Sequence, residues 1–415
     1  MVNYKSTVFF CYIGYIVQAV VNNLLPLFFV VFQSEFGISN AKLGNLILFN
    51  FFIQICVDLF CTKFGRVIGY RKAMIFAHFS AALGLSFISI LPLIINDLYI
   101  ALCISTVFFA IGGGLIEVMV SPMMDSMIRD NKGAAMSLLH SFYCWGQVLV
   151  VFATTVLVKI FGIGNWQFIP IIWAAIPFLN MFAFFKSPLP KMLSEKKRIA
   201  LKELFKNKIF IIMIIMMICA GGFELAISQW ASYFAETGLG VTKAMGDILG
   251  PCLFAVFMGI SRVLYGIIGD KLSISRAIAI CSALGIICYL FAGLSKNPYI
   301  ALLSCGICGF AVGIMWPGVY SIAGMMFKGG TAMFGVLAVA GDIGCSVGPW
   351  LTGIISTAIE SNQTLVLFGE NMGFTAEQFS IKLGVLSGII FPLIAFICAI
   401  SGKLKVKENV NYEAK

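Results

Sequence analysis

The chain has 415 residues, of which 60% are hydrophobic and only 11% are charged, and its mean hydropathy is +1.00. A water-soluble domain of this composition would expose one continuous apolar surface, so the composition excludes a soluble protein. The formal net charge of +10 does not indicate a nucleic-acid partner, because the basic residues alternate between loops and form no single stripe, a pattern typical of membrane topology.

Twelve apolar runs have about the 20 residues that a helix needs to cross the hydrocarbon core of a bilayer. The predicted spans are Thr7–Phe32, Leu43–Cys61, Ala73–Ile95, Leu98–Val120, Ala134–Val158, Trp166–Phe185, Ile209–Phe234, Met245–Ile268, Ala277–Leu294, Tyr299–Met326, Ala332–Ile359 and Leu383–Ser401. The first run is too long for a signal peptide and lacks a small-residue cleavage site. We therefore predict an all-α integral membrane protein with twelve transmembrane helices.

Lysine and arginine residues indicate how these helices are oriented. Of the 28 basic residues, 22 fall in loops and tails on the side of the N-terminus. Five fall on the opposite side, namely Lys42, Lys159, Lys243, Lys296 and Lys382. Because cytoplasmic loops carry the excess of positive charge, we expect both termini in the cytoplasm and the protein in the plasma (cytoplasmic) membrane.

The longest basic loop divides the chain into six spans and six. We predict an N-terminal six-helix bundle at residues 1–185, a cytoplasmic linker at 186–208, a C-terminal bundle at 209–402 and a cytoplasmic tail at 403–415. Within the linker, Glu195–Phe205 is amphipathic and is predicted to lie on the membrane surface. The linker is either a hinge between the halves or only a basic segment that sets topology.

The two halves also resemble each other in sequence. The fifth span opens with Gly133-Ala-Ala-Met136 and the eleventh with Gly330-Thr-Ala-Met333. A basic loop follows both the second and the eighth span. Parallel repeats of this kind are typical of transporters whose halves rock around a site near the membrane midplane.

The segment after the eighth span reads Gly266-Ile-Ile-Gly-Asp270-Lys271, and together with the two sets of six spans it resembles the major facilitator superfamily. That superfamily carries a G-x-x-x-D-(R/K) motif in this loop. The resemblance implies that Asp270 helps to close the central cavity at the cytoplasmic helix ends. A carboxylate there is also favoured by the exposed N–H groups of helix N-termini. Ser273 stands where the motif has glycine.

The corresponding loop of the first half departs further from the motif, because Arg66 occupies the aspartate position. We expect Asp58 to supply the missing carboxylate, in a pair with Arg66 or Arg71. The alternative is that Asp58 only extends toward the cytoplasm near its helix end. The predicted gating residues are Asp58, Arg66, Arg71, Arg262, Gly266, Asp270 and Lys271.

Three further segments resemble the fucose–proton symporter group of this superfamily. They are Gly112–Pro122 in the fourth span, Ser137–Gly146 in the fifth and Glu224–Trp230 in the seventh. The resemblance implies that these segments face the transport pathway. That group carries an aspartate in its first helix, where this chain reads Val21-Asn22-Asn23 with no acid. If coupling in that group needs two carboxylates, the resemblance implies that this protein couples differently or less tightly.

Charged side chains inside the predicted spans are few, and each is costly at bilayer depth unless it faces a protein interior or a water-filled cavity. Burial favours the protonated form of a carboxylate, which lets such a group load and release protons near neutral pH. The predicted proton-coupling residues are Glu117, Glu224, His140 and Asp342. For Glu117 the alternative is a hydrogen bond to a neighbouring helix. For Arg262 we expect an ion pair with a carboxylate. His78 is predicted to be a hydrogen-bond donor in helix packing.

Neutral polar and aromatic side chains outnumber fixed charges in the same spans. The predicted substrate-binding residues are Gln18, Asn22, Asn23, Tyr143, Trp145, Gln147, Ser228, Trp230 and Trp316. Such groups suit a neutral polar solute such as a sugar, whereas a polyanion would require arginine clusters. A hydrophobic cation is the alternative, because carboxylates beside aromatic rings bind cations. Pro317 after Trp316 is predicted to interrupt the tenth helix.

From these observations we expect a secondary active transporter that moves a small neutral polar solute, a sugar, together with protons by alternating access. The alternative in the same class is a proton-coupled antiporter that exports drugs or metabolites. A membrane enzyme or a nutrient receptor is disfavoured, because the chain has no H-E-x-x-H motif, no P-loop and only 14 residues after Ser401. We expect no metal, no cofactor besides the proton gradient, and a monomer in the lipid bilayer.

Overall fold

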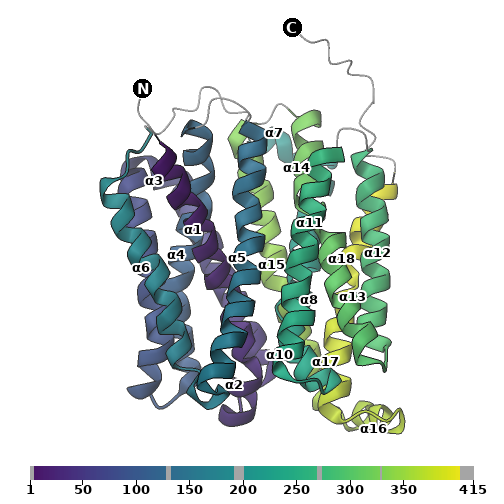
Figure 1. Cartoon of the computed structure of the whole chain (residues 1–415). Coiled ribbons are helices and arrows are strands. Elements are labelled where there is room, and N and C mark those ends of the chain that lie inside the picture. Colours follow the sequence, from purple (N-terminus) through teal and green to yellow (C-terminus); the bar gives the residue numbers. More distant parts are fainter. Residues whose placement is uncertain (1–3, 128–131, 191–200, 269–272, 328–329, 402–415) are drawn as a thin grey trace.

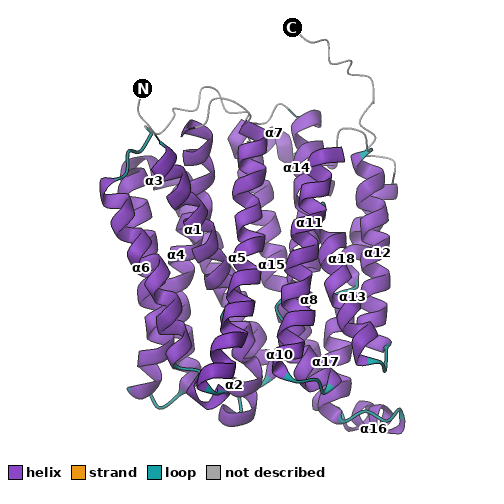
Figure 2. Ribbon diagram, in the orientation of Figure 1, coloured by secondary structure: helices purple, strands orange, loops and turns teal. Residues whose placement is uncertain are grey.

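The computed structural model describes residues 4–127, 132–190, 201–268, 273–327 and 330–401. Within these ranges every regular element is a helix (Figure 2). Twelve stretches are long and apolar enough to cross a membrane: Lys5–Phe36, Asn40–Cys61, Ile68–Leu93, Leu98–Met124, Leu138–Phe161, Phe168–Lys186, Lys208–Gly238, Lys243–Tyr265, Ile274–Leu294, Pro298–Ala323, Gly335–Glu360 and Ala376–Ile400. Each overlaps the run predicted at the same place, so the predicted all-helical protein with twelve spans is confirmed.

The N-half, residues 4–190, holds the first six spans. Its helices are α1 (Lys5–Asn23), η1 (Leu25–Phe28), α2 (Phe29–Phe36), α3 (Asn40–Ile90), η2 (Leu91–Leu93), α4 (Leu98–Met127), α5 (Lys132–Phe161), η3 (Ile163–Asn165) and α6 (Phe168–Lys186). Helix α3 covers the second and third spans and turns between them at Gly69. The φ angle of Gly69 is 74°, in the left-handed region that a residue without Cβ adopts most readily.

The C-half, residues 201–401, holds the last six spans. Its helices are α7 (Leu201–Phe205), α8 (Lys208–Ser228), α9 (Ala231–Tyr233), η4 (Phe234–Gly238), α10 (Lys243–Asp247), η5 (Ile248–Cys252), α11 (Leu253–Ile268), α12 (Ile274–Leu294), α13 (Pro298–Gly313), α14 (Met315–Met326), α15 (Gly330–Glu360), α16 (Gln363–Asn371), α17 (Ala376–Ser387) and α18 (Ile390–Ile400). Of the predicted amphipathic linker segment, residues 195–200 lie outside the described residues, and α7 forms at its end.

The first helix begins and the last helix ends at the same end of the bundle, at the top of Figure 1. We call this the terminal end and the opposite one the distal end. The prediction that Lys382 lies in a distal loop is wrong: the last span begins at Ala376, so Lys382 lies buried inside α17. Its Nζ donates to the carbonyl of Ser295 at 2.8 Å, just beyond the distal end of α12. Lys382 therefore still lies toward the distal end, as predicted.

Small residues allow α15 to pack closely against both halves. On the α3 side, a Cβ atom added to Gly44 would lie 3.3 Å from the Cα atom of Trp350. On the α8 side, a Cβ atom on Gly221 would overlap the carbonyl oxygen of Gly341. Close backbone approach at glycine is a common way to pack helices in a membrane, where lipid tails are as apolar as leucine. Helix α15 therefore joins the N-half to the C-half.

Several of the twelve spans are interrupted, among them the first, the seventh and the tenth. The first breaks after Asn23, ahead of Pro26, and the seventh breaks between Ser228 and Ala231. The tenth breaks at Ile314, and Pro317 has no N–H group to donate to the carbonyl four residues before it. The predicted interruption by Pro317 is confirmed. Such breaks free backbone polar groups, which are tolerated at membrane depth only when buried in protein or lining a cavity.

Candidate functional site

A network of amide side chains surrounds the break in the first span. The Oδ1 atom of Asn22 accepts hydrogen bonds from Asn50 Nδ2 at 3.2 Å and from Gln54 Nε2 at 2.8 Å, both on α3. Asn23 Nδ2 donates to the carbonyl of Ala19 at 2.9 Å and to the Tyr143 hydroxyl on α5 at 3.4 Å. The four amides are all buried. Asn22 and Asn23, predicted as substrate-binding residues, therefore lie at the centre of a connected polar network.

Gln229 carries this network across to the C-half. It lies in the break of the seventh span, and its Nε2 donates to the backbone carbonyl of Asn22 at 3.1 Å and to Asn23 Oδ1 at 3.2 Å. In an uninterrupted helix the carbonyl of Asn22 would accept from the N–H of residue 26, but Pro26 has none. The proline in one half therefore frees the carbonyl that a side chain of the other half binds.

Glu117 on α4 lies toward the terminal side of this network. Gln18 on α1 donates a short hydrogen bond from Nε2 to Glu117 Oε2. One turn further along α4, Ser121 shares a hydrogen bond of 2.7 Å with the Tyr15 hydroxyl. The ring of His140 on α5 meets Tyr15 edge to face, with 5.3 Å between ring centroids. The structure thus brings Glu117, Gln18 and His140 to one part of the N-half.

Asp58 and Asp342 meet where the two halves join. Asp58 belongs to α3 and Asp342 to α15, and their carboxyl groups are within side-chain hydrogen-bonding reach of each other. This contact continues the antiparallel packing of the two helices, which at the distal end pairs Asn40 Nδ2 with Ser356 Oγ at 3.0 Å. Both carboxyl groups are more than nine-tenths buried. Two ionised carboxylates at this separation repel each other, whereas a proton on one of them allows a hydrogen bond, so the contact is more favourable when one carboxyl group is protonated.

The predicted ion pair of Arg262 forms with Glu224. The Nη2 atom of Arg262 on α11 lies 3.6 Å from Glu224 Oε2 on α8, and both side chains are largely buried. Arg262 Nη1 also points at the sulfur of Cys144 on α5, at 3.2 Å. One turn along α8, the buried hydroxyl of Ser228 has no hydrogen-bond partner among the described residues. The pair therefore lies between the halves, with an open hydrogen-bonding group beside it.

A second group of charges joins the halves at the distal end. Asp247 on α10 is fully buried and accepts from Ser232, from Thr155 Oγ1 of α5 at 2.8 Å and from Lys243 Nζ at 3.3 Å. Lys243 Nζ also donates to the carbonyl of Leu27 in η1 at 2.6 Å. Thr155 and Leu27 belong to the N-half, and the other three belong to the C-half. We call these five residues the distal lock.

The remaining predicted substrate-binding residues lie at different places. Trp230 is fully buried and donates from Nε1 to the carbonyl of Pro349 at 2.9 Å, within the C-half. The ring of Trp316 packs over Gly341 of α15. Trp145 is 45% exposed and lies beside Gly259 of α11, and Gln147 is buried in α5. The hydrogen bond of Trp230 thus holds α15 in place, and the structure does not bring its indole N–H to the amide network.

The predicted gating contacts differ in part from the structure. Arg71 donates to the carbonyls of Phe184, Phe185 and Ser187 at the end of α6, with 2.8 Å to Phe184 and to Ser187. The predicted Asp58–Arg71 pair is thus replaced by a cap on α6, because the turn at Gly69 directs residue 71 toward that helix. The side chain of Arg66, and Asp270 and Lys271, lie outside the described residues, and Gly266 lies in α11.

Sequence reasoning missed several residues of these networks. Asn50 and Gln54 are spaced one helical turn apart, which is a signal for a polar helix face that the hydropathy count ignores. Pro26 follows Asn22 by four residues, which is a signal for a freed carbonyl. Lys243 and Asp247 have the same spacing of four, but the hydropathy pattern separates them, because it places Lys243 in a loop. The partnership of Asp58 with Asp342 has no local signal at all.

The packing role predicted for His78 is confirmed. Its Nδ1 lies 2.8 Å from the carbonyl of Met74 and its Nε2 lies 2.8 Å from Asn180 Nδ2 on α6. The Nδ1 contact lies within α3 and orients the ring, and the Nε2 contact holds α3 against α6.

Solved structures of membrane transporters have a fold similar to that of this chain. No curated protein sequence matches the chain. Among solved structures, a D-xylose–proton symporter has a TM-score of 0.77 at 16% identity, over 97% of this chain and 100% of its own. A bacterial homologue of the human lysosomal transporter Spinster, inward-facing and occupied, has a TM-score of 0.73 at 15% identity over 100% of both chains. The E. coli fucose:proton symporter has 0.62 at 16% identity, over 95% and 98%.

Likeness at these identities establishes the fold and leaves the substrate open. The model of the Major Facilitator Superfamily matches residues 11–349, which is most of the chain. With twelve spans, an all-helical fold and a polar site between two halves, the chain belongs to the Major Facilitator Superfamily, and it is a membrane transporter and not an enzyme.

Proposed function

We propose that the protein carries a small neutral polar solute, a sugar, across the membrane together with protons. The observation that supports this most directly is the set of buried oxygen atoms that have no hydrogen-bond partner among the described residues. They include four amide oxygens of the central region, on Gln18, Asn50, Gln54 and Gln229. A buried polar atom without a partner is unfavourable, so a solute rich in hydroxyl donors would complement this site.

The lack of unpaired positive charge near the amide network favours the same class of solute. Among the described residues, Arg262 is already paired with Glu224 at 3.6 Å, and Lys243, which reaches Leu27, is paired with Glu236 and Asp247. A polyanionic solute would need several unpaired cations there. A sugar as the solute agrees with the similarity in fold to a D-xylose–proton symporter and to a fucose:proton symporter. That similarity is one of fold alone.

The buried carboxyl groups are the candidates for binding the transported protons. The neighbouring carboxyl groups of Asp58 on α3 and Asp342 on α15 repel each other when both are ionised, so a proton on one of them favours the contact. Glu117 lies near both in the interior and is hydrogen-bonded to Gln18, which belongs to the same helix as Asn22. We infer that protonation holds the halves together at this depth, and that Glu117 links the protonation state to the substrate network through α1.

The test uses de-energised cells that produce the protein in weakly buffered medium. A panel of pentoses, hexoses, deoxyhexoses and nucleosides is added, and the pH of the medium is recorded. Proton symport predicts alkalinisation with one sugar, because each solute takes a proton from the medium into the cell. The variant Glu117→Gln is expected to abolish the alkalinisation, because an amide cannot load and release a proton.

The matched control is Glu370→Gln, an exposed glutamate on α16 at the distal side of the molecule. It should leave the alkalinisation unchanged. If no sugar changes the pH, and a cationic compound acidifies the medium under an imposed gradient, the proposal fails and the antiport alternative takes its place. Alkalinisation that survives in Glu117→Gln would retain symport and remove Glu117 from the coupling.

A further inference from the structure

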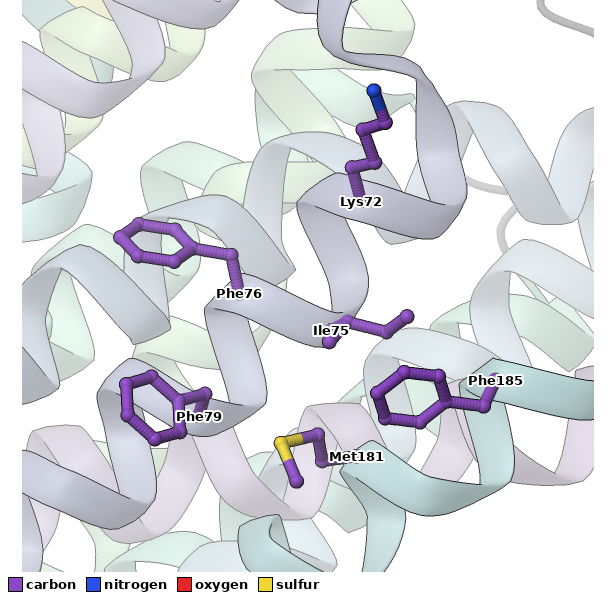
Figure 3. Close-up of a pocket in the computed structure, with 6 residues that line it drawn as sticks. All are labelled: Lys72, Ile75, Phe76, Phe79, Met181 and Phe185. Atoms are coloured by element: carbon purple, nitrogen blue, oxygen red, sulfur yellow. The ribbon is translucent and has the colours of Figure 1, made fainter.

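Two apolar grooves on the outer surface of the N-half meet at Lys72. The first lies between α3 and α6, has a volume of about 410 Å³ and is lined by Lys72, Ile75, Phe76, Phe79, Met181 and Phe185 (Figure 3). The second lies between the two arms of α3 and α4 and has a volume of about 540 Å³. Its lining includes Cys56, Phe60 and Ile111, and it shares Lys72 and Phe76 with the first. Phe76 therefore forms the ridge between two adjacent grooves.

The lining of both grooves suits hydrocarbon. Apart from Lys72, every lining residue is apolar or a cysteine. The rings of Phe60, Phe76, Phe79 and Phe185 are each about half exposed, between 47% and 54%. An apolar surface of this extent would be unfavourable in water, and it lies on helices that span the membrane, so acyl chains are its natural contact.

Lys72 supplies a cation at the point where the grooves meet. It is exposed, and it is the fifth residue of the span Ile68–Leu93, at the terminal end, which corresponds to the level of lipid headgroups. Figure 3 shows its amine pointing away from the apolar lining. None of the ion pairs among the described residues involves Lys72. Its neighbour Arg71, by contrast, is bound to three carbonyls of the α6 end.

We propose that this surface binds one anionic diacyl phospholipid, with its phosphate at Lys72 and one acyl chain in each groove on either side of Phe76. Charge complementarity selects the headgroup: a net negative lipid pairs with Lys72, whereas a zwitterionic lipid brings its own cation. Lys186, exposed and next to the groove residue Phe185, adds positive charge at the same end. A lipid held here contacts α3, α4 and α6, so it ties three helices of the N-half together.

The experiment is native mass spectrometry of the purified full-length protein, titrated with dioleoyl phosphatidylglycerol or dioleoyl phosphatidylcholine. The wild type is expected to bind phosphatidylglycerol more tightly. Lys72→Gln should weaken phosphatidylglycerol binding about fivefold, which corresponds to about 1 kcal/mol for one basic residue near an anionic lipid, and should leave phosphatidylcholine binding unchanged. Unchanged phosphatidylcholine binding shows that the Lys72→Gln protein is folded, and Lys72→Arg should restore the wild-type preference, which shows that charge is the cause.

Two further variants test the grooves and the specificity. Cys56→Trp fills the second groove and should weaken the binding of both lipids. Lys159→Gln removes an exposed lysine from the distal end of α5 and should change neither. The proposal is overturned if Lys72→Gln binds phosphatidylglycerol like the wild type, if Lys159→Gln loses as much affinity, or if Cys56→Trp binds both lipids normally. A dimer that carries no lipid would assign this face to a second copy of the chain, and would also overturn it.

Discussion

The distal lock makes a quantitative prediction for Thr155→Val. Alternating access requires the distal end to open, and the Thr155 Oγ1–Asp247 Oδ2 hydrogen bond of 2.8 Å joins α5 to α10 across the halves. A hydrogen bond to a charged group contributes about 1.5–3 kcal/mol. The same hydroxyl also lies 2.8 Å from the carbonyl of Val151, so its proton is shared and the lower value applies. About 1.5 kcal/mol corresponds to about a tenfold rise in the ratio of distal-open to distal-closed protein.

The assay is the distribution of distances between spin labels at positions 159 and 294, introduced as non-natural amino acids so that the thirteen native cysteines stay in place. Both positions are exposed, one at the distal end of α5 and the other at the distal end of α12. Thr155→Val should enlarge the long-distance population. Valine has the shape of threonine, and Asp247 retains Ser232 and Lys243, so the change removes one contact between the halves and leaves no unpaired carboxylate.

The neighbouring residue provides the matched control. Thr154 is also buried, but its hydroxyl accepts from Trp173 Nε1 at 2.9 Å, and both residues belong to the N-half. Thr154→Val should lower the thermal stability of the protein and leave the distance distribution unchanged. The reasoning is refuted if Thr155→Val has the wild-type distribution, or if Thr154→Val shifts it to the same extent.

Three further predictions follow from the interior contacts. Asp342→Asn gives the residue a permanent N–H donor toward Asp58, so the α3–α15 contact should no longer weaken as pH rises. The distance between spin labels on α3 and α15 should then be independent of pH. Arg262→Gln leaves Glu224 as a buried carboxylate without its cation, which costs about 3–5 kcal/mol when Glu224 is ionised. Calorimetry should therefore show a lower melting temperature for this variant at high pH than at low pH. An equal loss of melting temperature at both pH values would contradict the pairing. Gly221→Val forces α8 away from α15 and should reduce melting temperature and transport together, whereas normal values of both would contradict the close approach.

Much of the fold could be predicted because membrane insertion is decided locally. A run of about 20 apolar residues satisfies its own backbone as a helix and has few alternatives in hydrocarbon. Each of the twelve predicted spans therefore overlaps a span of the structure. The role of Pro317 was predictable for the same reason, since it depends on the backbone of its own helix. For His78 a packing role could be predicted from its apolar segment, but its partner Asn180 on α6 could not. The boundaries were less certain, and Lys382 was misplaced because a buried lysine at a span end resembles a loop residue.

Prediction of the site was partial. Glu117, Gln18, Asn22 and Asn23 could be singled out as interior polar groups because polar side chains stand out in an apolar run, and their functional roles stay predictions. Gln229 was passed over although it lies beside Ser228, because nothing in its own segment shows that Pro26, two hundred residues earlier, has freed a carbonyl for it. The sequence thus indicated which polar groups are buried and left their partners undetermined.

By itself, the sequence determined the number and order of the spans and the scarcity of charge inside them. It also determined the positions of the glycines that allow close helix packing and of the prolines that interrupt helices. These properties depend on hydrophobicity and backbone chemistry within a single helix. Only the tertiary structure decided that Asp58 meets Asp342, that Arg71 caps α6, and that Lys243 and Asp247 lock the distal end. Each of these contacts depends on which face of one helix packs against another, and in a bundle of twelve similar apolar helices that choice is made by the packing of all of them together.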